Sequence, residues 1–502
     1  MKNLKRILLI VLACVMTLSC FVGCKKDEEE GGGTTGATAA TVAEPGPYDS
    51  ELPADLNYGD EVITIISRDV IGQSDEFYST GEDGANIVSN AVYTRNQAVA
   101  GRLGVKLDVI PVVDDTTNAH ATVIAKVSSD ITSGSGEYDI ITAPAYTALA
   151  KVTEGLFYNL RDVENLNLDK YYWAQGFNEF GTVGSAQYLA TGMVSLSLYR
   201  FMYVTVYNNA IFEERDLESI YDKVKNNTWT MEEQYQMTSK LYIDDGDESG
   251  VYDEKDTYGF VSGARTSVDA YLASANVEII GKDSEGYYTY VGTQEKLSGL
   301  ADKIIKLFYT NEGAYIIPTG RDNTDNADIA DMFAGKKVAM ASMKVQALEE
   351  KLRKLEFEYS IAPLPKYDAN QENYGTLVQD QVTIMALPMT VTEDNRAMLG
   401  AVMECFAAES YKNTYSAYFE TALSYQYLQN QESLEMLKII YESIDFAPLL
   451  SAYATDVGWN TMLRNVAGQK YNSISFQFAS TAKNVQTKVD EVNQKYRDLL
   501  AG

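Results

Sequence analysis

The residues whose types and spacing are most specific lie in one acidic stretch, from Asp245 to Asp256. A calcium loop of the EF-hand type needs oxygen ligands at positions 1, 3, 5, 7, 9 and 12, with glycine at position 6 for the turn. The stretch has Gly250 at the sixth position and an oxygen ligand at each of the others: Asp245, Asp247, Ser249, the Val251 carbonyl, Asp253 and Asp256. We therefore predict a structural calcium site. Its affinity should be weak, with a Kd of roughly 10⁻⁴ M or somewhat tighter, because Asp256 is shorter than the usual glutamate. A solvated acidic surface loop is the alternative.

Other reactive residues are scarce, and their scarcity excludes several kinds of chemistry. The 502-residue chain has one histidine, His120, so no site in it uses two imidazoles. It contains neither a Gly-x-Ser-x-Gly nor a His-Glu-x-x-His motif. With 71 acidic and 41 basic side chains the net charge is −30, which argues against binding to nucleic acid or to anionic lipid through a basic patch. Carboxylates are abundant, so the sequence does not exclude the pair of catalytic carboxylates that a glycosidase needs.

The first residues have the pattern of a secretory signal, with a basic start and an apolar run before a cysteine. Val22-Gly23-Cys24 resembles the lipobox of bacterial lipoproteins, although Phe21 replaces the usual leucine. The resemblance implies that 1–23 is a signal peptide and that Cys24 is diacylated, which suffices for stable anchoring. We expect a lipid-anchored protein on the extracellular face of the cell membrane. Cys20 as the lipidated residue, or an uncleaved anchor, are the alternatives.

Residues 24–58 lack apolar periodicity and are rich in glycine, threonine and alanine, followed by prolines. This composition predicts a flexible linker that holds a globular body roughly 30 Å from the membrane. Beyond the linker the chain has a single cysteine, Cys405, within an apolar stretch. We expect it to pack as a small hydrophobe on a helix, so that the folded part contains no disulfide.

Strands and helices alternate in the first part of the globular body. Short β-branched runs at 62–67, 105–110 and 138–143 predict strands, and apolar periodicity at 86–103 and 123–131 predicts the helices between them. This order is typical of parallel βαβ units, in which ligands bind at the carboxyl ends of the strands. Later strands are expected at 204–207, 337–341, 358–362 and 381–386, and mostly helix after them. An amphipathic helix is predicted through Val485–Leu499.

Several motifs, in order, resemble those of the extracellular solute-binding proteins of ABC importers, of the maltose- and oligosaccharide-binding type. They are Tyr-Asp-Ile-Ile at 138–141 with Leu-Phe-Tyr-Asn-Leu at 156–160, Val-Tyr-Asn-Asn-Ala-Ile-Phe at 206–212, Asn-Thr-Trp-Thr-Met-Glu-Glu at 227–233, Gly-Lys-Lys-Val-Ala-Met at 335–340 and Ala-Pro-Leu-Pro at 362–365. Asn209 replaces a lysine that is usual in the family. Thr230 and Glu233 also form a capping box, which favours a structural role for Trp229 before them.

The resemblance implies an α/β fold of the two-lobe, periplasmic-binding-protein-like type (type II), with a hinge between the lobes and a largely helical C-terminal part. Residues 59–195 and 385–450 would form the first lobe, and residues 196–384 and 451–502 the second. The chain would cross between the lobes near 192–203 and 376–388. A ligand would then lie between the lobes, where hinge closure encloses it.

The candidate ligand-binding residues lie after the strands of the first lobe, in the two crossings and among the late helices. Arg68 directly precedes the candidate Asp69, and Gln379 directly precedes the candidate Asp380. Aromatic faces and planar polar side chains are what a sugar requires. The candidates are Asp69, Tyr146, Tyr199, Arg200, Lys344, Gln346, Asp380 and Trp459. A surface or packing role is the alternative for each of them.

The family resemblance implies a monomeric receptor that captures a small ligand, preferably a carbohydrate or oligosaccharide, and delivers it to ABC permease subunits. Such a protein is not an enzyme and needs no catalytic residue. A secreted carbohydrate-active hydrolase and a cell-surface glycan-binding adhesin are the alternatives. Lobe closure on a soluble ligand without turnover distinguishes the receptor from both.

Overall fold

The computed structural model describes residues 50–69, 76–82, 86–113, 119–246, 253–317, 325–428, 430–452 and 461–501. The predicted signal peptide, Cys24 and most of the predicted linker lie outside these residues. Within the described ranges, no helix combines the length and the apolar character that crossing a membrane requires.

The first sheet is built around β1, in the strand order β12-β3-β1-β2. β2 and β3 run parallel to β1, as the βαβ pattern predicts, and β12 pairs antiparallel with β3. Ile63 and Ile65 of β1 belong to the core shared with α2 and α14, whereas Ile66 belongs to the core shared with α3 and α4. The sheet is therefore covered on both faces, as parallel strands require. Its strands are β1 (Glu61–Asp69), β2 (Val105–Val113), β3 (Ile140–Pro144) and β12 (Thr383–Ala386).

The second sheet has the strand order β10-β4-β9-β5-β8. β5 runs parallel to β9 and β8, whereas β4 runs antiparallel to β9 and β10. Its strands are β4 (Tyr203–Asn208), β5 (Tyr258–Gly263), β8 (Ala314–Ile317), β9 (Val338–Lys344) and β10 (Tyr359–Ala362). Two small pairs complete the strands: β6 (Ile280–Lys282) with β7 (Tyr288–Tyr290), and β11 (Thr376–Leu377) with β13 (Ile444–Asp445).

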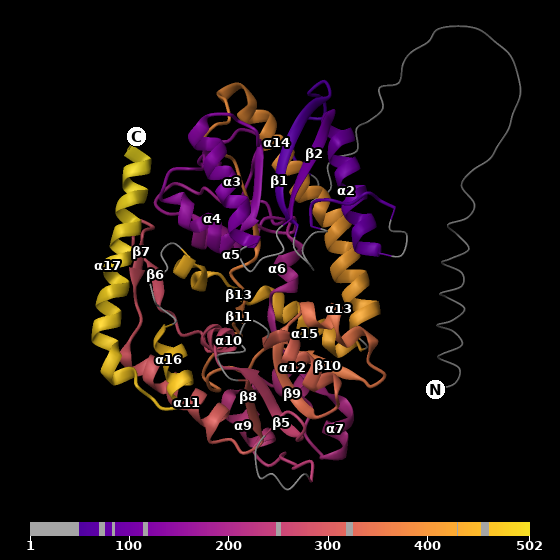
Figure 1. Ribbon diagram of the computed structural model, residues 1–502, viewed down its shortest axis with the longest axis vertical. Helices are drawn as coiled ribbons and strands as arrows, with labels where there is room; N and C mark the ends of the chain where they lie inside the picture. Colours follow the sequence, from indigo (N-terminus) through magenta and orange to yellow (C-terminus); the bar gives the residue numbers. More distant parts are fainter. Residues whose placement is uncertain are drawn as a thin grey trace, which may run out of the picture. The chain divides into compact units, whose positions relative to one another are not determined.

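Helices pack on both sheets (Figure 1). Those before β11 are α2 (Ile87–Leu103), α3 (Ala119–Ser133), α4 (Ala145–Val152), η2 (Leu160–Asp162), α5 (Gln175–Gly181), α6 (Leu196–Arg200), α7 (Asn209–Glu214), α8 (Ile220–Lys225), α9 (Met231–Thr238), α10 (Thr266–Ser274), α11 (Gln294–Tyr309), α12 (Asp325–Ala334), α13 (Gln346–Glu350) and η4 (Leu352–Lys354). Those after β12 are α14 (Glu393–Ser410), η5 (Tyr411–Tyr427), α15 (Gln431–Glu442), η6 (Ala447–Ala452), α16 (Thr461–Gln469) and α17 (Ile474–Ala501).

The chain passes between the two sheets in the predicted ranges. α6 leads from the first sheet to β4, and the segment from β11 to β12 leads back. The two passages touch each other, because the Gln379 amide donates to the Phe201 carbonyl over 3.1 Å. We call residues 192–203 the first crossing and residues 376–388 the second crossing. The described chain thus has the predicted two-lobe α/β architecture, with one sheet in each lobe.

The C-terminal part is largely helical, as predicted. α14 continues into the π-helix η5, in which Tyr411, Tyr415 and Phe419 form a stack with ring centroids 5.4 and 5.1 Å apart. α15 packs against the strand β10 of the second sheet and against the helix α8, although the sequence analysis assigned its residues to the first lobe. The exact lobe boundaries therefore stay a prediction.

Several local predictions are confirmed by the packing. Trp229 is fully buried and its indole donates to the Pro363 carbonyl over 2.9 Å, so its role is structural. Thr230 caps α9 by accepting from the Glu233 amide over 3.2 Å. Glu233 does not complete the capping box, because its carboxylate pairs with Lys223 at 2.8 Å, a stronger charge-assisted contact. Cys405 is buried on α14 and is not in a disulfide.

Candidate functional site

The carboxyl edge of the first sheet carries three of the residues that the sequence analysis named. Arg68 and Asp69 are the last residues of β1, and Tyr146 lies in the first turn of α4, directly after β3. Arg68 is buried, whereas Asp69 and Tyr146 are half-buried. The second crossing lies against this edge, because the amides of Ala145 and Tyr146 donate to the carbonyls of Val382 and Asp380, over 2.8 and 2.9 Å. The edge where ligands bind in such sheets therefore meets the passage between the lobes.

The second lobe contributes Lys344, the last residue of β9. Its ammonium donates to Gln379 Oε1 over 2.9 Å and lies 5.1 Å from the Phe201 ring, so it contacts both crossings. The backbone supports this placement, since Tyr203 pairs with Lys344 and the Val345 amide donates to the Met202 carbonyl over 3.0 Å. Lys344 is thus held at the junction of the two lobes.

Asp380, in the second crossing, lies among charged groups of the second lobe. Burial raises the pKa of its carboxyl group, and Asp269 of α10 raises that pKa further, while Arg464, Lys344 and Arg265 act in the opposite direction. Tyr146 belongs to the same group: burial and Asp380 raise the pKa of its hydroxyl, and Arg68 opposes them. We call this set the Asp380 cluster: Arg68, Tyr146, Arg265, Asp269, Lys344, Asp380 and Arg464. Its donors and acceptors can hold the hydroxyl pairs of a polar ligand.

The ion pair between Asp269 and Arg464 positions the second-lobe side of the cluster. Arg464 Nε lies 3.1 Å from both carboxylate oxygens of Asp269, and Arg464 Nη2 donates to Oδ2. Asp269 is buried in α10, and Arg464 belongs to α16. A buried carboxylate with a two-nitrogen partner is rigidly oriented.

Two of the predicted residues lie in a packed interior instead. Tyr199 is fully buried among the rings of Tyr415, Tyr418, Phe419 and Tyr441, with centroids 5.4–6.1 Å away. Arg200 is 2% exposed and forms a two-pronged ion pair with Glu349, over 3.0 and 3.1 Å. These contacts show that both side chains stabilise the packing of the first crossing against η5 and α13.

The remaining predictions are placed less centrally. The Gln346 amide donates to Glu350 one turn further along α13, over 2.7 Å. Trp459 lies outside the described residues. Of the eight predicted ligand residues, the Asp380 cluster contains Tyr146, Lys344 and Asp380. The ligand contacts themselves stay a prediction.

Sequence reasoning missed Arg265, Asp269 and Arg464. Asp269 and Arg464 lie 195 positions apart, so no local spacing connects them. One signal was present: Asp269 stands in Ser-Val-Asp-Ala-Tyr-Leu-Ala-Ser, an apolar run in which a charge needs a partner. The partner could not be identified without the fold.

Three of the six predicted calcium ligands are described: Asp245, Asp253 and Asp256. Asp247, Ser249 and Val251 lie outside the described residues. Carboxylate oxygens of Asp245 and Asp256, the first and twelfth positions, lie within 4.8 Å of each other and of one from Asp244, which the prediction did not include. The first and twelfth positions of the predicted loop therefore lie close together, and calcium binding stays a prediction.

The Asp256 carboxylate also ties this loop together through protein donors. It accepts from the Asp245 amide over 3.0 Å and from the hydroxyls of Tyr242 and Tyr258 over 3.0 and 3.3 Å. Burial acts to raise the pKa of Asp256, but these hydrogen bonds, with one from the Asp253 amide, outweigh it, and the pKa is lowered. Asp256 is therefore ionised at neutral pH, as a ligand for calcium must be.

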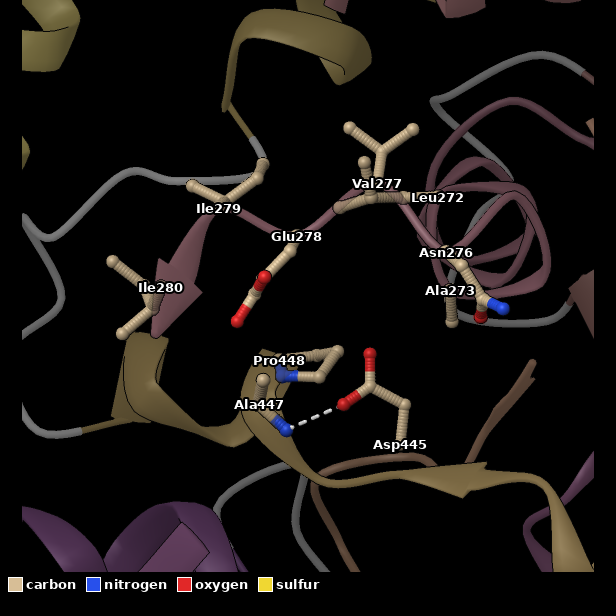
Figure 2. Close-up of a pocket in the computed structure, with 10 residues that line it drawn as sticks. All are labelled: Leu272, Ala273, Asn276, Val277, Glu278, Ile279, Ile280, Asp445, Ala447 and Pro448. Carbon is tan, nitrogen blue, oxygen red and sulfur yellow. Dashed lines mark hydrogen bonds between the residues drawn. The ribbon is translucent and has the colours of Figure 1, made fainter. Parts of the chain in front are cut away.

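A separate pocket of about 320 Å³ lies where the end of α10 and β6 face β13 and η6 (Figure 2). The carboxylates of Glu278 and Asp445 point into it. Burial and Glu278 raise the pKa of Asp445, while a hydrogen bond from the Ala447 amide opposes them. A pocket of about 300 Å³ adjoins it and shares Glu278, Ile280, Asp445 and Ala447. None of the predicted ligand residues that the structure describes lines either pocket.

Comparison with known proteins identifies the fold. No family model matches the sequence, and no curated protein matches it. Among solved structures, a cyclo/maltodextrin-binding protein complexed with maltotetraose superimposes with a TM-score of 0.55 at 15% identity, covering 86% of this chain and 97% of that one. The GacH receptor of Streptomyces glaucescens, solved with acarbose, gives a TM-score of 0.52 at 13% identity, covering 88% and 99%. UspC of M. tuberculosis gives 0.50 at 12% identity, covering 86% and 100%.

These three structures match nearly along their whole length. The described chain therefore has the two-lobe fold of these solute-binding proteins, and the two crossings connect its lobes. The expected fold class is confirmed. At this level of sequence identity the structural similarity establishes only the fold, and the function has to be argued from the site.

Proposed function

We propose that the chain is a solute-binding receptor that captures a carbohydrate or oligosaccharide between its lobes and delivers it to the permease subunits of an ABC importer. The observation that carries the proposal is the Asp380 cluster, in which polar side chains from both lobes converge beside the two crossings. The names of the matched structures support a sugar as the ligand, since they include a maltodextrin-binding protein and a receptor solved with acarbose. The receptor acts as a monomer, with one ligand per molecule.

A panel of soluble ligands tests this function directly. The panel contains maltose, maltotetraose, a polyol, a uronic acid oligosaccharide and a dipeptide. Isothermal titration calorimetry should find one class of saccharide that binds with a 1:1 ratio, and chromatography should find it unchanged after incubation. Binding of the dipeptide alone would move the proposal to another class of solute, and no binding to any member would remove its basis.

The hydrolase alternative has a defined place to be tested. Glu278 and Asp445 line the same pocket, and a glycosidase needs two carboxylates in one site. We expect no product from any glycan of the panel. Product that disappears in the Glu278→Gln and Asp445→Asn variants would identify an enzyme and overturn the receptor.

Calcium is proposed as a structural ion in the loop from Asp245 to Asp256, where Asp244 would add a carboxylate. The proximity of the loop's first and twelfth residues supports the proposal. At a calcium concentration a hundredfold above Kd the ion should stabilise the fold by about 2.7 kcal/mol. Thermal unfolding with calcium, with magnesium and with a chelator measures this effect. The proposal fails if Asp247→Ala leaves the calcium dependence unchanged.

Lipid anchoring through Cys24 is proposed to hold the receptor at the extracellular face of the membrane. The basis is the sequence Val22-Gly23-Cys24 after an apolar run. Labelled palmitate should be incorporated by the wild-type protein, and the Cys24→Ala variant should leave the membrane fraction. Incorporation into the variant would point to Cys20 as the acylated residue.

A further inference from the structure

Arg68 is a buried cation whose hydrogen bonding is incomplete. Its side chain is 1% exposed, and Nη2 donates to Thr383 Oγ1 over 2.7 Å and lies 3.7 Å from Glu76 Oε2. Its Nε and Nη1 atoms have no hydrogen-bond partner. An arginine side chain has five N–H donors, so three of the five are unused. Buried donors without a partner destabilise a fold, so this arrangement requires an explanation.

A neighbouring arginine shows that the same region can satisfy such a group. Arg95 of α2 is also fully buried, and its Nη2 donates to the carbonyl of Glu76 over 2.9 Å. Its other nitrogens donate to Asn96 and Ser410, and its guanidinium lies 5.1 Å from the Phe406 ring. Each nitrogen of Arg95 therefore has a partner. Of these two neighbouring buried arginines, Arg68 is the one with nitrogen atoms that lack a hydrogen-bond partner.

The acidic partner of Arg68 is bonded to both crossings. Glu76 Oε1 accepts from the Ser197 amide over 2.5 Å and from the Ser195 hydroxyl over 3.4 Å, and both serines belong to the first crossing. Glu76 Oε2 accepts from the hydroxyl of Thr383 in the second crossing. Thr383 and Ser197 are bonded to each other, with the Thr383 amide donating over 2.9 Å. One buried carboxylate thus joins the two segments that must move when the lobes close.

Arg68 also borders the proposed ligand site. Its positive charge lowers the pKa of the Tyr146 hydroxyl, whereas the nearby carboxylate of Asp380 raises that pKa. The backbone of Tyr146 is bonded to Asp380, three residues before Thr383 in the second crossing. A shift of the second crossing on ligand binding would therefore change the distance between Arg68 and Glu76.

We propose that Arg68 is a positioning residue for ligand capture. In the arrangement described here Arg68 faces Glu76 through one long contact. When the crossings move on lobe closure, the guanidinium forms a two-pronged ion pair with Glu76, and this pair favours the closed state. The inference rests on the proposed function, because it assigns the residue that couples ligand binding to the hinge.

Arg68→Lys is the informative variant, because it keeps the charge next to Glu76 but removes the fork that a two-pronged pair needs. We expect its affinity for the best saccharide of the panel, with maltotetraose as the first probe, to fall about tenfold. Arg68→Met should show a larger loss. Arg95→Met is the matched control: it removes an equally buried arginine that bonds to the backbone carbonyl of Glu76 but to neither crossing, so it should lower the melting temperature and leave the affinity within twofold.

A fluorescence energy-transfer pair, with one dye on each lobe, supplies a measurement that a merely structural role would not change. In the unliganded protein Arg68→Lys should shift the distance distribution toward larger separations, and Arg95→Met should not. If Arg68→Lys keeps the wild-type distribution and affinity, or if Arg95→Met changes both as strongly, the inference is wrong. If the wild type binds no saccharide, the proposed function fails, and the unliganded distributions still decide the role of Arg68.

Discussion

Asp380 occupies a position that is unfavourable for stability and suitable for binding. Burial, and then Asp269, raise the pKa of its carboxyl group, so the folded protein holds this proton more tightly than the unfolded chain does. The contribution of Asp380 to the free energy of unfolding therefore falls as the pH rises above about 4, where the unfolded chain loses the proton first. Such trade-offs between stability and activity are frequent at functional sites.

Asp380→Asn should accordingly have opposite effects on stability and on binding. Chemical denaturation should show a smaller loss of stability between pH 4 and pH 7 than in the wild type, because asparagine carries no charge to bury. Calorimetry at pH 7 should show an affinity at least about tenfold lower, since a hydrogen bond to a charged group contributes about 1.5–3 kcal/mol.

Asp445→Asn is the matched control for this prediction. Asp445 is also half-buried, and burial together with Glu278 raises the pKa of its carboxyl group. It lines the pocket of Figure 2 and lies outside the Asp380 cluster. The control should reproduce the change in pH dependence and leave the affinity unchanged. An Asp380→Asn variant that binds as tightly as the wild type would show that Asp380 does not contact the ligand.

At the scale of elements, α9 offers a test of the local physics that the sequence reveals. Thr230 accepts a hydrogen bond from the Glu233 amide, one of the unpaired amides at the start of this helix. Thr230→Ala should lower the free energy of unfolding by about 1 kcal/mol, whereas Thr230→Ser, which keeps the hydroxyl, should lose much less. Equal losses in the two variants, measured by urea denaturation, would assign the effect to the methyl group instead.

Elements with a strong local pattern were predictable, and elements stabilised by distant contacts were not. The β-branched run at 62–67 and the periodic run at 86–103 correspond to β1 and α2. β5 was missed because Gly259 interrupts the pattern, although glycine is required there: a Cβ atom would lie 2.4 Å from the Thr238 carbonyl oxygen. The hairpin β6–β7 was also missed, since its contact with the first lobe, from the Tyr288 hydroxyl to the Phe180 carbonyl, spans 108 residues.

The same distinction applies to the candidate site. Tyr146, Lys344 and Asp380 were predictable because each lies at or just beyond the end of a strand or in a crossing. Tyr199 was selected by the same reasoning, but the aromatic side chains of η5 and α15 surround it in the fold. Position along the chain thus indicates which residues are near a cleft, whereas packing decides which of them face it.

At the scale of the whole molecule, the proposed function requires two lobes that move about the crossings. The described contacts provide the parts of such a device: two sheets, two adjacent passages and a polar cluster that draws on both lobes. A hinged receptor closes around its ligand because the closed state binds the ligand more tightly than the open state does. Closure on a soluble ligand without turnover would distinguish this receptor from an adhesin and from a hydrolase.

Small-angle X-ray scattering with and without ligand is therefore the most direct test. Addition of the best-binding saccharide should decrease the radius of gyration, and the same saccharide should be recovered intact from the sample. A saccharide that binds tightly without any change in the radius of gyration, or one that is cleaved, would contradict the account.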